Sequence, residues 1–243
     1  MIVLKFIHTI FVYLVSVITF FIGTTLTIPF ALFTREHHKP FQFSARLWAK
    51  MLLFLCGANV KISGLQNVPK EGGVIIASNH ISYLDPLAIG CVSPRIIDFM
   101  ARDSLFSIPV LGGWMRAVGA FGVKRNSADI SAMKEAIYRL QHGRVLTLFP
   151  EGTRQISVLV STKVEPGVGF LAAKSGAVVI PAFVSGTEKA LPKGAKFFRF
   201  SRIRVKFGAH IKIDKDKPYE EIAQDILKDI RLLATEVIAT KSS

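Results

Sequence analysis

The chain has 243 residues, which suits one domain with a short appendage and allows a buried core without disulfides, so two cysteines are not a disulfide scaffold. Half of the residues are hydrophobic, 20% are charged and the mean hydropathy is +0.41, which together exclude a disordered chain. The net charge of +14 predicts an anionic partner, namely nucleic acid, an anionic membrane surface or a phosphorylated substrate.

The N-terminal segment is the most apolar part of the chain. The 29 residues between Lys5 and Arg35 include no Asp, Glu, Lys or Arg. About 20 apolar residues are enough to span the hydrocarbon core of a bilayer. A secretory signal peptide, the rival interpretation, has an apolar region of roughly 7–15 residues followed by a small-residue cleavage site, and this run is longer and lacks that site. We therefore expect a membrane-attaching helix that Pro29 stops or kinks.

A second apolar stretch covers residues 47–56 and follows a basic loop, to which we assign Arg35, Lys39, Arg46 and Lys50, with Glu36 as its acidic residue. This stretch is too short to span a bilayer, so it would lie in the interface or pack beside the first helix. If the first helix spans the membrane, the basic flank places the rest of the chain in the cytoplasm. A helical pair immersed in one leaflet fits equally well, and a buried core hairpin is the third alternative. The sequence predicts membrane contact through residues 1–57.

From residue 58 onward, short apolar runs alternate with helical stretches. Buried strands are predicted at residues 74–77, 96–100, 145–149 and 178–181, and helices at residues 128–141 and 167–175. Residues 203–207 alternate between apolar and basic side chains, as in an outer strand, and an amphipathic helix follows Pro218. The order predicts an α/β domain over residues 58–243, with a mostly parallel sheet flanked by helices.

A histidine and an aspartate follow the first of these strands. Asn79 and His80 come directly after the strand, and Asp85 lies five residues beyond the histidine. The carboxylate can fold back onto one ring nitrogen, fix the tautomer and stabilise the imidazolium once the other nitrogen has taken a proton. Such a pair suits the activation of a substrate hydroxyl. The alternative is that His80 is a turn residue and Asp85 caps a helix.

A second group of polar residues follows the strand at residues 145–149. Gly152 allows the backbone to approach a ligand closely, and the guanidinium of Arg154 matches phosphate oxygens. Glu151 would orient Arg154 or accept a hydrogen bond from a substrate hydroxyl. A surface turn with a local ion pair is the alternative, and it weakens because both groups of residues follow predicted strands.

The chain resembles the glycerolipid acyltransferase family, and within it the bacterial 1-acylglycerol-3-phosphate acyltransferases. The resemblance covers roughly residues 58–210. It rests on the N-H-x-x-x-x-D block at residues 79–85, G-V-K-R at 122–125, F-P-E-G-T-R at 149–154 and V-I-P-A at 179–182. The first and third blocks together are specific, whereas the second and fourth are weak alone.

The resemblance implies a role for individual residues. His80 would be the general base and Asp85 its partner. The residues implied in substrate binding are Asn79, Arg102, Arg125, Glu151, Gly152, Thr153 and Arg154. The family usually has a lysine where this chain has Arg102, and a serine where it has Gln155. A guanidinium can also bind phosphate, but its reach differs from that of a lysine side chain.

The implied reaction moves an acyl group from acyl-CoA or acyl carrier protein to the sn-2 hydroxyl of lysophosphatidate, giving phosphatidate. Glycerol 3-phosphate or another lysophospholipid as acceptor is one alternative, and a catalytically silent lipid-binding protein is the other. No metal and no cofactor are expected. The basic, Phe-containing segment from Lys189 to Lys217 fits anionic headgroups or a solvated face, and the apolar N-terminus makes nucleic acid the weakest alternative. The expected location is the membrane, with the catalytic domain on its cytoplasmic face.

Other reactive side chains have simpler interpretations. Cys56 and Cys91 lie in apolar surroundings and are expected to be packed thiols. His37 and His38 are expected in a loop, because no cysteine or acidic cluster accompanies them. His142 precedes a glycine and is expected to end a helix.

Overall fold

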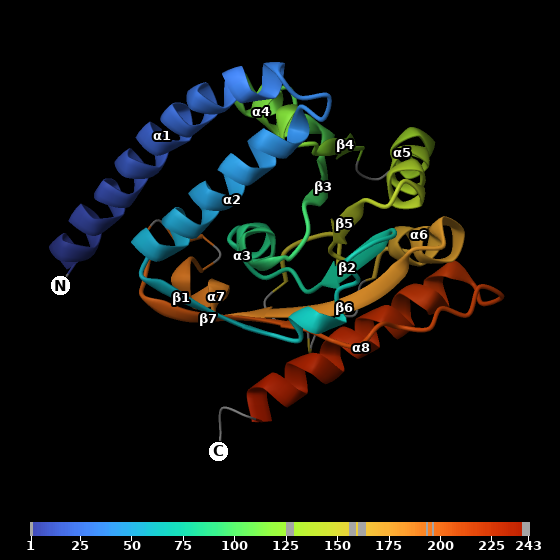
Figure 1. Ribbon diagram of the computed structural model, residues 1–243. Coiled ribbons are helices and arrows are strands. Elements are labelled where there is room, and N and C mark those ends of the chain that lie inside the picture. Colours follow the sequence, from blue (N-terminus) through green and yellow to red (C-terminus); the bar gives the residue numbers. More distant parts are fainter. Residues whose placement is uncertain are drawn as a thin grey trace.

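The structure is a computed structural model that describes residues 2–124, 129–155, 159, 164–192, 194, 195 and 197–239. Two helices, α1 (Ile2–Leu32) and α2 (His38–Leu55), come first and lie side by side (Figure 1). Over Val3–Leu32, α1 has a hydropathy of 2.1, and in the described part of the chain it alone is long and apolar enough to cross a membrane. Pro29 lies within the last turn of α1, which ends three residues later.

The second helix begins earlier than the sequence predicts. Lys39, Arg46 and Lys50 lie on α2 and not in a basic loop, so that prediction is wrong. The helix tolerates these residues because its other side supplies the buried contacts, made by Gln42, Ala49, Leu52 and Leu53. Basic side chains on the remaining surface do not interrupt an amphipathic helix.

The centre of the molecule is a seven-stranded sheet. Its strands are β1 (Ala58–Ser63), β2 (Val74–Ser78), β3 (Ile97–Arg102), β4 (Phe121–Val123), β5 (Val145–Leu148), β6 (Val178–Ser185) and β7 (Ser201–Phe207). They lie in the order β1-β7-β6-β2-β5-β3-β4, and every neighbouring pair is parallel except β6 with β7. The predicted fold class, a mostly parallel sheet flanked by helices, is confirmed.

Helices cover both faces of the sheet (Figure 1). Those that follow α2 are α3 (Asp85–Val92), α4 (Leu111–Ala117), α5 (Ile130–Gln141), α6 (Gly167–Ser175), α7 (Thr187–Ala190) and α8 (Tyr219–Ala239), with short 3₁₀ turns at Leu65–Asn67 and Asp103–Leu105. One hydrophobic cluster joins α5, α6 and α8 to one face, and a second joins α2 and α3 to the other. Successive strand residues supply opposite faces: Ile75 belongs to the first cluster and Ile76 to the second.

One strand prediction is wrong, and two strands of the sheet were not predicted. β7 is not an outer strand, because β1 and β6 pair with it on either side. Its alternating pattern arises because Ile203, Val205 and Phe207 are buried on one face while the basic residues between them remain accessible on the other. β1 and β4 were not expected: β4 has three residues, and most of β1 is accessible at the edge of the sheet.

A buried carboxylate joins α2 to the α/β part of the chain. Asp98 on β3 is 1% exposed, and its Oδ1 accepts hydrogen bonds from Nη2 of Arg144 at 2.6 Å and Nε2 of Gln42 at 3.2 Å. Nη1 of Arg139 lies 3.2 Å from the other carboxylate oxygen. Hydrogen bonding to Asp98 raises the pKa of the Arg144 guanidinium above its ordinary value. α2 is therefore bonded to the sheet, and the division of the chain at residue 57 stays a prediction.

Candidate active site

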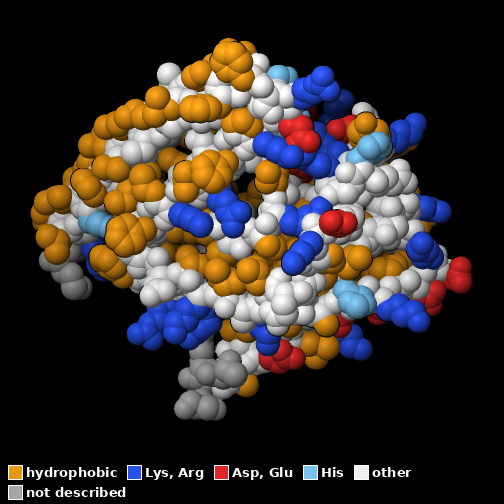
Figure 2. Space-filling view, viewed as in Figure 1, with side chains coloured by type: hydrophobic (Ala, Val, Ile, Leu, Met, Phe, Trp, Pro, Cys, Tyr) orange, Lys and Arg blue, Asp and Glu red, His pale blue; other side chains and the backbone are white. Residues whose placement is uncertain are grey.

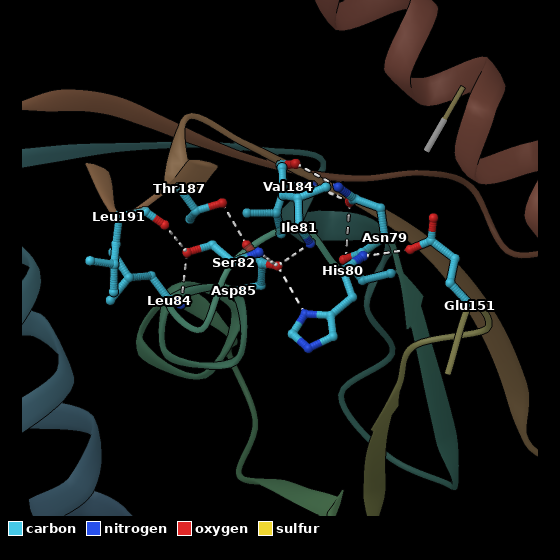
Figure 3. Close-up of polar contacts among 11 residues, drawn as sticks. Asn79, His80, Ile81, Ser82, Leu84, Asp85, Glu151, Val184, Thr187 and Leu191 are labelled. Carbon is cyan, nitrogen blue, oxygen red and sulfur yellow. Dashed lines mark hydrogen bonds and ion pairs between the residues drawn. The ribbon is translucent and has the colours of Figure 1, made fainter. Parts of the chain in front are cut away.

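The histidine and the aspartate of the first block meet directly after β2. Nδ1 of His80 lies 3.0 Å from Oδ2 of Asp85, whose side chain is fully buried while the imidazole keeps 18% of its surface (Figure 3). The ring also stacks on Phe149, with its centroid 4.2 Å from that of the phenyl ring. Nε2 of His80 has no hydrogen-bond partner among the described residues.

The carboxylate of Asp85 organises the turn around it. Its Oδ2 also accepts hydrogen bonds from the backbone N–H groups of Ile81 and Ser82, each at 2.7 Å. Its Oδ1 accepts a 2.5 Å hydrogen bond from the hydroxyl of Thr187, at the start of α7. Asp85 is the first residue of α3, whose N-cap position is Leu84, and its carboxylate bonds N–H groups that precede the helix, so the interpretation of Asp85 as a helix cap is wrong. Neighbouring donors and burial hold this acceptor in a single orientation.

Two other predicted residues lie behind the histidine. The side-chain amide of Asn79 is fully buried and forms two 2.8 Å hydrogen bonds with the backbone of Val184 on β6. Glu151 is also buried, and its Oε2 accepts a 2.8 Å hydrogen bond from the backbone N–H of His80 (Figure 3). Both contacts position the histidine turn, and a substrate-binding role for either residue stays a prediction.

The third block forms the facing wall. Gly152 has φ +64°, and a Cβ atom there would lie 2.6 Å from Cγ of Glu165, which explains the glycine. The guanidinium of Arg154 lies 3.5 Å above the ring centroid of Tyr83, a cation–π contact that connects the two blocks. The backbone N–H of Gln155, at the position of the usual serine, donates to the carbonyl of His80 at 2.8 Å.

A cavity of about 1720 Å³ opens beside these side chains. Its polar wall includes His80, Arg102, Lys124, Gly152, Thr153 and Arg154, and Figure 2 shows basic side chains around the hollowed centre of this face. Its other walls are mostly apolar and include Phe99, Trp114, Met133, Ile137 and Leu171. The structure therefore brings Arg102 and Arg154 into one cavity with the histidine. Arg125 lies outside the described residues.

Three contacting residues were not predicted. Phe149 and Tyr83 lie within the two motif blocks and contact His80 and Arg154, respectively. Their position in the motifs, as aromatic residues, is the feature of the sequence that could have predicted these contacts. Thr187 carries no such signal, because it lies 102 residues from the carboxylate that it contacts. Only the pairing of β2 with β6 brings the ends of these two strands together.

The remaining reactive residues lie apart from this pair. Cys56 and Cys91 are buried free thiols, and burial raises their pKa values to about 12 and about 11, which agrees with packed thiols. His142 directly follows α5, as expected. His37 lies between α1 and α2, whereas His38 begins α2 and is not in a loop. In the described part of the chain, no three His, Cys, Asp or Glu side chains are grouped as metal ligands would be.

Comparison with known proteins agrees with this geometry. The sequence profile of the acyltransferase family matches residues 59–185, which is more than half of the chain and includes both motif blocks. The chain belongs to this acyltransferase family. The predicted resemblance is thereby confirmed.

Named relatives within the acyltransferase family are similar over most of the chain. A 1-acyl-sn-glycerol-3-phosphate acyltransferase of Borreliella burgdorferi is 31% identical over 189 residues, which cover 76% of this chain and 74% of that protein. A chloroplast protein of the same name from Arabidopsis thaliana is 28% identical over 183 residues, 74% of this chain. The chain spans about half the length of that relative and of a similar one from Brassica napus.

A solved acyltransferase shares the fold. The crystal structure of the 1-acyl-sn-glycerophosphate (LPA) acyltransferase PlsC from Thermotoga maritima matches with a TM-score of 0.80 at 21% sequence identity. The match covers 96% of this chain and 97% of that one, so it includes the N-terminal helices as well as the sheet.

Proposed function

We propose that the chain acylates the sn-2 hydroxyl of 1-acyl-glycerol 3-phosphate and so produces phosphatidate. The proposal rests on the hydrogen-bonded pair of His80 and Asp85 at a cavity that also holds Arg154. Relatives named for this reaction, in bacteria and chloroplasts, support the choice of lysophosphatidate as acceptor. The donor is an acyl thioester, either acyl-CoA or acyl carrier protein.

His80 acts as the general base. Its Nδ1 proton is held by Asp85, so Nε2 takes the proton of the acceptor hydroxyl as that oxygen attacks the carbonyl carbon of the thioester. A C–O bond forms, the tetrahedral intermediate collapses, and the C–S bond breaks. His80 then returns the proton to the departing thiolate, so no covalent acyl-enzyme is needed. General base catalysis contributes roughly 10²–10⁴-fold, so positioning of the two substrates supplies much of the remainder.

The cavity supplies that positioning. Arg154 and Arg102 face the same space as His80, and two guanidinium groups match the oxygens of a phosphomonoester. The apolar walls formed by α4, α5 and α6 accommodate acyl chains, whose burial contributes about 0.8 kcal/mol per CH₂ group. Arg125 is proposed to assist in phosphate binding, and Thr153 lines the same wall.

We also propose that α1 attaches the protein to a membrane with the cavity on the cytoplasmic side. Large apolar side chains of α1 remain accessible along its length, for example Leu4 at 74% and Phe30 at 69% exposure, and Figure 2 shows hydrophobic side chains gathered there. Contact of these apolar side chains with water is unfavourable, whereas insertion into a bilayer removes their surface from water. The basic residues after α1 favour the cytoplasmic side and an anionic membrane surface.

The test is an acceptor panel with detergent-purified protein. Acyl-CoA or acyl carrier protein is supplied, and free thiol is measured with lysophosphatidate, glycerol 3-phosphate, lysophosphatidylcholine or no acceptor. Thiol release that depends on lysophosphatidate supports the proposal. Equal or faster release with another acceptor reassigns the substrate, and no release with any acceptor indicates a silent lipid-binding protein.

The histidine variant completes the test. His80→Ala removes the base and is expected to abolish thiol release, while binding to vesicles that contain phosphatidylglycerol is retained. His210→Ala is the matched control, because His210 is an exposed histidine outside the cavity lining. Turnover by His80→Ala at the wild-type rate would contradict the assignment of the base.

A further inference from the structure

Thr187 occupies a position that the proposed chemistry has not yet used. It follows β6, begins α7 and is fully buried. Its hydroxyl donates the 2.5 Å hydrogen bond to Oδ1 of Asp85, and in the described part of the chain no other donor contacts that oxygen (Figure 3). The other carboxylate oxygen, by contrast, accepts from His80, Ile81 and Ser82.

We propose that Thr187 is a positioning residue, which acts through Asp85 to hold His80 in its productive orientation. This role rests on the proposed function. Three N–H donors fix the position of one carboxylate oxygen, and a donor at the second oxygen also restrains the plane of the carboxylate. Because both Asp85 and Thr187 are fully buried, water does not replace the hydroxyl if it is removed.

The backbone around Thr187 is built to place this hydroxyl. Gly186 has φ +92°, and a Cβ atom there would lie 2.1 Å from the carbonyl oxygen of Arg202 on β7. The hydroxyl of Ser201 donates to the carbonyl of Gly186 at 2.8 Å. On the other side of the turn, the amide of Asn79 bonds the backbone of Val184. The segment is therefore anchored to the histidine turn and to β7, independently of the contact with Asp85.

The test compares two substitutions at the same site. Thr187→Val keeps the shape of the side chain and removes the hydroxyl, whereas Thr187→Ser keeps the hydroxyl and removes the methyl group. Since hydrogen bonds to charged groups are the stronger ones, we expect Thr187→Val to lower kcat roughly 10- to 100-fold, with KM for lysophosphatidate changed less than about threefold. We expect Thr187→Ser to retain kcat within about threefold of wild type.

A matched control separates positioning from folding. Ser93→Ala removes a buried hydroxyl that donates to the carbonyl of Arg95 at 2.8 Å, at the end of α3 opposite to Asp85 and outside the cavity lining. It is expected to lower the melting temperature as much as Thr187→Val while kcat stays near wild type. Equal losses of kcat in Thr187→Val and Ser93→Ala, or in Thr187→Val and Thr187→Ser, would overturn the proposal.

A second measurement does not depend on turnover. The ring ¹⁵N resonances of His80, assigned with His80→Gln, are recorded in detergent for wild type, Thr187→Val and Thr187→Ser. We expect a changed Nδ1 resonance in the valine variant and a wild-type resonance in the serine variant. Unchanged resonances in the valine variant would refute the positioning role even if the acceptor panel shows no activity, whereas loss of the proposed function alone would leave the shift in place.

Discussion

The turn at residues 79–85 and the loop at residues 149–154 follow neighbouring parallel strands, yet they are held in different ways. In the first, side chains bond to the protein: Asn79 to β6, Asp85 to Thr187 and to the turn itself. In the second, Gly152 and Arg154 face the cavity, and the guanidinium rests on an aromatic ring. This difference fits the proposed function, in which the first segment holds the base and the second contacts the phosphate of the acceptor.

After His80→Ala, the largest effect is expected from removing the negative charge of Asp85 in the turn at residues 79–85. Asp85→Asn can keep an acceptor toward His80 while its amide donates to Thr187, so the hydrogen-bonded geometry survives and the negative charge is lost. We expect kcat to fall roughly 10²- to 10⁴-fold with little change in KM, because the imidazolium is no longer stabilised. Steady-state kinetics with lysophosphatidate measures both constants. An Asp85→Asn variant whose KM rises while its kcat is unchanged would contradict the roles assigned to the two segments.

The cavity-facing arginine is expected to act on binding. Arg154→Ala should raise KM for lysophosphatidate by roughly 10- to 100-fold, with a smaller effect on kcat, because a charge-assisted contact to phosphate is lost. Monoacylglycerol, which lacks the phosphate, supplies the control: its KM should not respond to the substitution. An unchanged KM for lysophosphatidate would remove Arg154 from the site.

At Gly152, in the loop at residues 149–154, we expect a steric clash with a neighbouring side chain to cost more than the strain of a positive φ angle. Gly152→Ala places a side chain at positive φ and 2.6 Å from Glu165. The left-handed conformation alone costs about 1–2 kcal/mol. Gly72→Ala is the matched control, since Gly72 also has positive φ but no atom of the described residues outside its chain neighbours lies within 4 Å of its added Cβ atom.

Thermal unfolding of the two glycine variants isolates the steric contribution. We expect the alanine at residue 152 to lower the melting temperature further than the one at residue 72, and to lower kcat/KM for lysophosphatidate, because Glu165 or the loop must shift. Identical behaviour of the two variants would show that the close approach has no consequence.

The smallest effect is expected from the aromatic ring beneath the guanidinium. Tyr83→Leu removes the cation–π contact, which at an exposed site is worth about 0.5–1 kcal/mol and predicts a rise in KM of about two- to fivefold. Tyr83→Phe keeps the ring and should retain the wild-type KM. If both variants behave alike, the ring does not orient Arg154.

Local pattern explains why part of the site was predictable. Runs of apolar residues identified β2, β3, β5 and β6, and the motif residues follow two of these strands. Because β2 and β5 are parallel neighbours, their carboxyl ends lie at one edge of the sheet and bring His80 close to Glu151. The alternation of apolar and basic residues at 203–207 was misleading. It arises from one accessible face of β7, which lies between β1 and β6, and not from a position at the edge of the sheet.

The amino-acid sequence by itself determined the α/β class, the apolar N-terminal helix and the choice of His80, Asp85 and Arg154 as candidate site residues. Each of these depends on a pattern of residues that are close together in the chain. Only the tertiary structure decided the strand order, the bonding of Gln42 to Asp98, and the contact between Asp85 and Thr187. Those features depend on side chains that are distant along the chain and meet only after the strands have paired, so no local spacing encodes them.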